Sequence, residues 1–130
     1  MSSNSVTPAN VHPPAGAYSH GMIASGIGRT LYISGQLGLD GSGKLVDGFA
    51  GQAAQCWRNI TAILQAADMT AHHLVKVTTF LTNIADAPEL GRIREPFLDG
   101  ARPASTLVGV SALVRPEWLI EIEAIAFKNG

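Results

Sequence analysis

The residues with the clearest chemical potential lie near the end of the chain, where Glu121 and Glu123 stand two positions apart. They interrupt a run rich in isoleucine and alanine over residues 119–127, a composition that predicts a β-strand. Since successive strand side chains point to opposite faces, both carboxylates share one face and the apolar residues share the other. The spacing alone leaves two interpretations open. The carboxylates either pair with groups at an interface, or they move protons and bind a ligand.

The histidines and the single cysteine are not spaced in a way that predicts a metal site or a nucleophilic catalytic site. His72 and His73 are adjacent, with no cysteine or carboxylate at ligand spacing, which predicts a solvated turn and no metal site. His12 and His20 have no aspartate placed to orient them, so a nucleophilic triad is poorly supported. Cys56 falls within an apolar helical repeat, which predicts a buried and unreactive thiol.

Composition narrows the class of protein. The 130 residues suit one domain, and a single cysteine without a bilayer-spanning apolar run or signal peptide predicts a cytoplasmic protein. The net charge of −1 and nine scattered basic residues give no phosphate-binding stripe, so we expect no nucleic-acid partner and no membrane association. Charged residues make up only 15% of the chain, which indicates that one face packs against copies of itself.

The elements that must position these groups follow from the hydrophobic pattern. Residues 1–14 are polar and contain proline, which predicts a flexible N-terminal arm. Helices are predicted from Gly51 and from Pro88, because apolar residues recur there every three or four positions. Strands are predicted over residues 21–25, 30–36, 74–82, 104–110 and 119–127, the first two forming a hairpin. The order ββαβαββ indicates an α+β fold, with two helices on one face of a single mixed sheet and a partner subunit on the other.

Four short segments, read together, resemble a known family. They are residues 17–21 (AYSHG), 32–36 (YISGQ), 102–104 (RPA) and 120–126 (IEIEAIA). In this order they are similar to the Rid family, also called YjgF or reactive intermediate deaminase proteins and formerly L-PSP endoribonucleases. The resemblance makes residues 15–130 a single Rid-type domain. It implies a chorismate-mutase-like fold and a homotrimer whose interfacial clefts hydrolyse imines or enamines to keto acids and ammonia, without a metal or organic cofactor.

The resemblance also assigns roles to individual residues. Glu121 matches the glutamate that positions the attacking water, while Tyr18, Ser34 and Gly35 match substrate contacts. Ser105 stands at a substrate-binding position where active deaminases of the family carry an arginine. That arginine binds the substrate carboxylate through two parallel hydrogen bonds, and one hydroxyl cannot reproduce this geometry. We therefore expect ordinary amino-acid-derived imines to be poor substrates.

A second departure is Gly91, which stands where the family usually has an asparagine. Whether Arg92, Arg94 or Arg102 reaches the cleft is left open by the sequence. The leading hypothesis is a hydrolase resembling 2-iminobutanoate/2-iminopropanoate deaminases that acts on an atypical small metabolite. The alternative is a catalytically silent trimer that binds or senses a small molecule. Ribonuclease activity, a third possibility, lacks a basic groove to support it.

Overall fold

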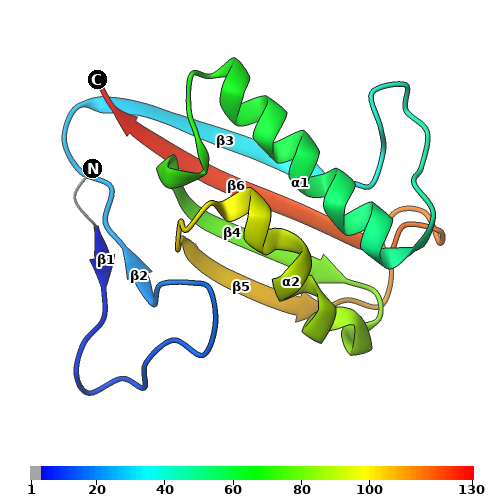
Figure 1. Cartoon of the computed structure of the whole chain (residues 1–130), viewed down its shortest axis with the longest axis horizontal. Coiled ribbons are helices and arrows are strands. Elements are labelled where there is room, and N and C mark those ends of the chain that lie inside the picture. Colours follow the sequence, from blue (N-terminus) through cyan, green and yellow to red (C-terminus); the bar gives the residue numbers. More distant parts are fainter. Residues whose placement is uncertain (1–3) are drawn as a thin grey trace.

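The fold is built on one mixed four-stranded sheet. A computed structural model describes residues 4–130. The strands lie in the order β3 (Gly28–Gln36), β6 (Ile120–Asn129), β4 (Leu74–Leu81) and β5 (Ala104–Gly109), as Figure 1 shows. β6 runs antiparallel to both of its neighbours, and β4 pairs in parallel with β5. The last strand of the sequence therefore lies inside the sheet, with a neighbour on each side.

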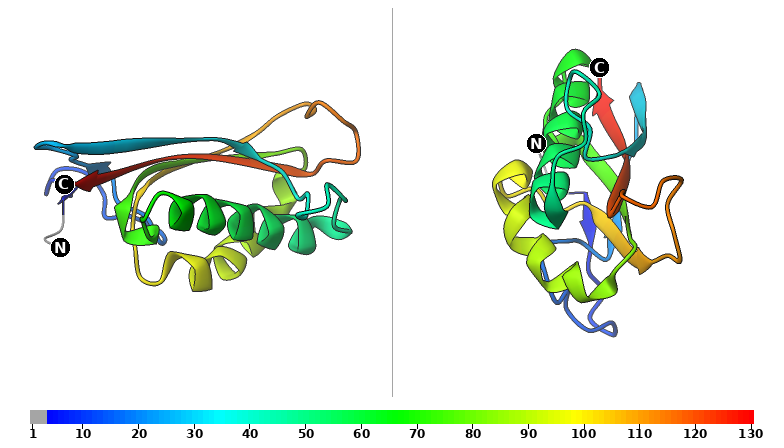
Figure 2. Two further views of the ribbon diagram at one scale, coloured as in Figure 1. Left: turned by 90° about the horizontal axis from the view of Figure 1, so that it is seen from above. Right: turned by 90° about the vertical axis from the view of Figure 1, so that its right-hand side faces the viewer.

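Two helices, α1 (Gly48–Ala66) and α2 (Ala87–Leu98), cover one face of this sheet, while the other face carries no helix (Figure 2). The predicted alternation along β6 is confirmed. Its helix-facing side chains are buried, whereas Glu123 on the open face is exposed. Neither helix within residues 4–130 combines the length and the apolar character needed to cross a membrane. The helix-facing residues of β6 are Ile120, Ile122, Ala124 and Ala126.

The predicted hairpin is wrong. The segment at 21–25 contributes only β2 (Gly21–Met22), which pairs with β1 (Ser5–Val6) in a separate two-stranded sheet. Residues 1–14, predicted to be a loose arm, thus contain a strand, and residues 1–3 lie outside the described residues. The arm supplies backbone partners to β2, and Ile23 N–H also donates to the Asn4 carbonyl at 2.8 Å. The predicted turn over residues 26–29 is likewise only a bend at residues 26–27, since Gly28 and Arg29 already belong to β3. Composition cannot say which segment a strand pairs with.

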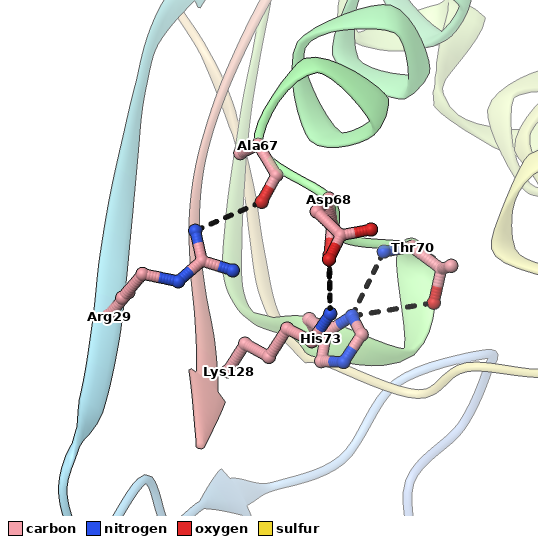
Figure 3. Close-up of polar contacts among 6 residues, drawn as sticks. All are labelled: Arg29, Ala67, Asp68, Thr70, His73 and Lys128. Carbon is pink, nitrogen blue, oxygen red and sulfur yellow. Dashed lines mark hydrogen bonds and ion pairs between the residues drawn. The ribbon is translucent and has the colours of Figure 1, made fainter. Parts of the chain in front are cut away.

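The C-terminal end of α1 is attached to two strands by cations (Figure 3). Arg29 of β3 donates to the Ala67 carbonyl at 3.0 Å. Lys128 of β6 donates to the Asp68 carbonyl at 2.7 Å and to its carboxylate at 3.1 Å. The hydrogen bond from Lys128, and then its positive charge, hold the pKa of Asp68 below its usual value. These contacts satisfy carbonyls left without partners where the helix ends, and they fix its position over the sheet.

His72 and His73 lie in a short turn, η1 (Ala71–His73), as predicted. The Thr70 N–H donates to Nδ1 of His73 at 2.9 Å, and Nε2 of His72 lies 3.5 Å from the Asp99 carboxylate. Figure 3 shows His73 beside Lys128. Burial, and then the charge of Lys128, lower the pKa of His73. Both histidines therefore stabilise the connection between α1 and β4.

Candidate functional site

Glu121 and Gly35 come together on the open face of the sheet. A Cβ atom added to Gly35 would lie only 2.7 Å from the carboxyl carbon of Glu121 and 2.9 Å from its Cγ. The Glu121 side chain therefore lies directly over the Gly35 backbone, a position that any larger residue would fill. A glycine inside a strand commonly marks such a close approach. The structure thus places these two predicted site residues in contact.

The approach depends on an irregularity between β3 and β6. Ile33 pairs with Ala124 and Gln36 pairs with Ile122, so Ser34 and Gly35 together occupy the place opposite one residue of β6. This extra residue is a β-bulge, which bends the strand and redirects its side chains. Ser34, predicted to bind substrate, is exposed at the bulge. The open face consequently carries a hydroxyl and a carboxylate near the same break in the ladder.

Side chains of α1 fix the segment that follows the bulge. The Cys56 thiol donates to the Gln36 carbonyl at 3.2 Å. The Asn59 amide donates to the Leu37 carbonyl at 3.2 Å and to the Leu39 carbonyl at 3.0 Å. The Leu37 and Leu39 carbonyls lie beyond the end of β3, and the helix supplies the donors that they require. The position of Gly35 is therefore set partly from beneath the sheet.

The Gln52 side chain hydrogen-bonds the backbone at the beginning of β6 in the same way. Its amide donates to the Glu117 carbonyl at 3.2 Å, and its own oxygen accepts from the Leu119 N–H at 3.0 Å. A Cβ on Gly38 would lie 2.6 Å from Gln52 Cβ, so this side chain also packs against the segment leaving β3. Sequence reasoning missed Gln52 and Asn59. Their signal was present, because they extend the helical spacing of Cys56 as polar residues within an apolar stripe.

Two titratable side chains in this region, the Cys56 thiol and the Glu121 carboxylate, differ in whether they can react. Burial, and then the nearby charge of Glu121, raise the pKa of the Cys56 thiol to about 12. Cys56 is fully buried, as predicted, and stays a thiol at physiological pH. By contrast, no hydrogen bond or ion pair among residues 4–130 engages the Glu121 carboxylate. This half-buried acceptor is free to bind water or a ligand.

Tyr18 lies elsewhere, on the segment beside the beginning of β5. The Ser19 N–H donates to the Pro103 carbonyl at 3.1 Å, and Ser19 forms an isolated bridge with Ala104. The Tyr18 hydroxyl accepts from the Ala15 N–H at 3.1 Å. Tyr18 also lines a cavity of about 380 Å³ between the N-terminal strands and the main body of the protein. It therefore belongs to the β5 edge of the sheet.

Ser105 lies on the helix side of that edge. It is in register with Val77, whose side chain is buried beneath the helices, so Ser105 points the same way. Nη1 of Arg94, on α2, donates to Ser105 Oγ at 3.5 Å. Arg102 instead pairs with Glu95 at 2.9 Å. Among the three arginines that the sequence left open, Arg94 is the one that reaches Ser105.

The predicted site residues thus form two groups within one chain. Glu121, Gly35 and Ser34 lie on the open face over β3 and β6, whereas Ser105 faces α2 from β5 and Tyr18 adjoins it. Since β4 separates β6 from β5, the two strands are about 10 Å apart at the usual strand spacing. One protomer does not gather these residues into a single cleft.

A shallow hollow of about 210 Å³ lies on the open face of the sheet. Its lining includes Ser34, Lys76, Glu123 and the aromatic ring of Tyr32, which is 75% exposed. Thr78 is in register with Glu123 and also lines the hollow. The open face therefore mixes charged, hydroxyl and aromatic groups, and its composition suits contact with another protein surface.

Comparison with known proteins places the chain in one family. The model of the endoribonuclease L-PSP family matches residues 9–128. A 2-iminobutanoate/2-iminopropanoate deaminase of Rattus norvegicus is 39% identical over 88% of this chain and 82% of its own. A putative regulator AldR of Lactococcus lactis is 39% identical over 91% of this chain and 94% of its own. The crystal structure of YyfB from Yersinia pestis, a protein of unknown function of the conserved Rid family, has a TM-score of 0.87 and 33% identity, covering 97% of this chain and 98% of its own. The chain belongs to the endoribonuclease L-PSP family, whose members include the Rid proteins.

Proposed function

We propose that the protein hydrolyses an imine or enamine of a small metabolite to a carbonyl compound and ammonia. One observation carries this proposal: the Glu121 carboxylate lies over the Gly35 backbone without a hydrogen-bond partner among residues 4–130. A free carboxylate at a strand bulge is suited to orient a water molecule. The relatives that are 2-iminobutanoate/2-iminopropanoate deaminases support the same reaction class.

In the proposed reaction, water adds across the carbon–nitrogen double bond. An enamine first tautomerises to its imine, and the imine reacts as the protonated iminium. Glu121 accepts a proton from the water as its oxygen attacks the iminium carbon, giving a neutral carbinolamine. The carboxylic acid then returns this proton to nitrogen. As the carbon–nitrogen bond breaks, the Glu121 carboxylate takes the hydroxyl proton, the carbonyl forms, and ammonia leaves and takes up that proton as ammonium. General acid and base assistance of this kind is worth about 10²- to 10⁴-fold in rate. The residues alone supply every proton transfer, so the proposal includes no metal or organic cofactor.

We propose further that the active form is a homotrimer in the cytoplasm, with each cleft shared by two protomers. The separation of the two groups of site residues supports this arrangement, because a second copy could bring the β5 edge of one chain to the open face of another. The exposed Tyr32 ring and the low fraction of charged residues support it as well. The proposed partners are a small substrate and further copies of the chain.

A turnover assay with paired variants tests the catalytic role. Glu121→Gln should lower hydrolysis of freshly generated 2-iminobutanoate by about 10²- to 10⁴-fold, measured as 2-oxobutanoate formed. Glu123→Gln is the matched control, since it removes a carboxylate from the same face of the same strand and should retain most of the activity. If Glu121→Gln turns over substrate at the wild-type rate, the proposed role of this residue is wrong.

A second candidate is a catalytically silent protein that binds or senses a small molecule. The relative described as a putative regulator favours it, as does a serine at position 105. This candidate predicts ligand binding with no turnover in the wild type. Under it, Glu121→Gln changes ligand affinity alone, so the assay above separates the two functions.

A further inference from the structure

The Arg94 guanidinium is a partly buried cation without an anionic partner. Its Nε is buried and has no hydrogen-bond partner among residues 4–130. Its single hydrogen bond is the long one to Ser105 Oγ, at 3.5 Å, and Ser105 is neutral. Burial lowers the pKa of Arg94, which shows that the site disfavours the charge it holds. A buried guanidinium costs free energy unless its donors are paired.

The neighbouring arginines of α2 and its C-terminal side do not share this feature. Arg92 pairs with Glu89 at 3.3 Å and keeps 76% of its side chain exposed. Arg102 pairs with Glu95 at 2.9 Å. Arg94, Arg102 and Glu95 therefore lie together beside the edge of β5, and their charges sum to one positive charge. A single positive charge is neutralised by a monoanion such as a carboxylate, whereas a doubly charged phosphate would leave a net negative charge.

The surface of α2 one turn before this arginine is open. Gly91 lies three residues before Arg94 and therefore occupies the same side of α2. A Cβ added to Gly91 would meet no atom within 4 Å. Ser105 lies on β5, an edge strand of the main sheet, and is only partly buried. The absence of a side chain at Gly91 leaves room on α2 one turn before Arg94.

We propose that Arg94 and Ser105 form a carboxylate-binding site, which takes the carboxylate of a small 2-imino acid or its 2-oxo product. The planar guanidinium supplies parallel N–H donors to the two oxygens, and the Ser105 hydroxyl supplies one more. The binding site rests on the geometry described above, and the identity of its ligand rests on the proposed function. Arg94 belongs to α2, so it approaches the substrate carboxylate from a different direction than an arginine side chain on β5 would. The length and shape of the substrate that fits therefore differ from those that suit a β5 arginine.

Titration of the protein with 2-oxobutanoate, followed by NMR or calorimetry, tests this site without any turnover. Arg94→Met should weaken binding about ten- to a hundredfold, the usual effect of losing hydrogen bonds to a charged group. Arg94→Lys should recover only part of the affinity, because an ammonium cannot make the parallel pair of bonds. Arg92→Met is the matched control and should bind like the wild type. The amide 2-oxobutanamide, which lacks the carboxylate, should bind the wild type weakly.

A stability measurement separates ligand binding from a structural role. Without ligand, Arg94→Met should unfold at the wild-type temperature or above, since it removes an unpaired buried cation. The proposal is overturned if Arg94→Met and Arg94→Lys both bind 2-oxobutanoate like the wild type, or if the wild type does not bind it at millimolar concentration. Binding that depends on Arg94 in a protein without turnover would instead retain this site and reject the deaminase function.

Discussion

At the scale of single residues, the contact between Gly35 and Glu121 explains why a glycine stands near the end of β3. Gly35→Ala would place a methyl group where the carboxyl carbon now lies within 2.7 Å. We expect it to displace Glu121 and to lower turnover by at least tenfold. The unfolding temperature should change little, because the displaced atoms are the end of a flexible, half-exposed side chain. Turnover of 2-iminobutanoate and thermal unfolding measure the two effects.

The control for this prediction is Gly41→Ala in the loop after β3. An added Cβ there meets no atom within 4 Å, so turnover and unfolding temperature should stay at their wild-type values. If Gly35→Ala is as active as Gly41→Ala, the contact between Gly35 and Glu121 has no part in the chemistry.

Residue types alone gave an incomplete picture of the cleft. Alternation along the last strand predicted the face of Glu121, and the family motifs indicated Gly35 as a site residue, but neither predicted the contact between them. From the sequence, Ser105 indicates that the group which binds the substrate carboxylate is missing. Sequence spacing carries no information on how closely α2 packs against β5. Only the packed structure brings Arg94, eleven positions earlier, to within 3.5 Å of that hydroxyl.

At the scale of elements, the turn between α1 and β4 should give the protein a pH-dependent stability. The pKa of His73 is lower in the folded protein than its usual value of 6.5, chiefly because of burial and then Lys128. The unfolded chain therefore binds the proton more readily. This histidine has no effect on stability well above pH 6.5, and it destabilises the fold as pH falls below that value.

Thermal unfolding between pH 8 and pH 5 tests this prediction. The wild type should lose more stability across that range than His73→Asn, which has no titrating ring. The Asp68 carboxylate beside it titrates below 3.8 and stays outside the window. Equal losses in the two proteins would show that protonation of His73 is not coupled to folding.

Most helices and strands could be predicted from the sequence, but the segments with which the strands pair could not. Helical periodicity indicated both helices, and two-residue alternation indicated β6, because each is a local property of the sequence. The pairing of β2 with β1 and the bulge at Ser34 depend on contacts between distant segments. Gln52 and Asn59 could have been found as polar interruptions of an apolar helix face, but their carbonyl partners lie on loops whose path the sequence does not fix.

At the scale of the whole molecule, one chain carries both groups of residues of the proposed site but keeps them apart. Glu121 lies on the open face, and Arg94 with Ser105 lies on the helix side of the β5 edge. A substrate that contacts both groups requires that the β5 edge of one protomer meet the open face of the next. A closed ring of identical contacts satisfies this requirement for every copy, as cyclic symmetry does in homo-oligomers.

This arrangement predicts that two variants, each impaired at low substrate concentration, restore activity when they are mixed. Glu121→Gln retains Arg94, and Arg94→Met retains Glu121, so a shared cleft between unlike protomers can contain both intact groups. After unfolding and refolding an equal mixture, about one quarter of the clefts in randomly assembled rings should be intact, since each cleft draws one group from each of two neighbours. Turnover of 2-iminobutanoate should then rise to about a quarter of the wild-type value, with sedimentation confirming a trimer.

Ile125→Arg, introduced into both variants, is the control for this experiment. Ile125 lines the hollow on the open face, and a guanidinium buried there without a partner would cost several kcal/mol. The rings should dissociate and the recovery should disappear. Gln65→Arg, which adds the same charge to the solvent side of α1, should leave the recovery intact. The opposing outcome is a mixture that stays inactive although sedimentation shows mixed trimers. In that case Glu121 and Arg94 of one chain do not belong to different clefts, and the proposed composite site is wrong.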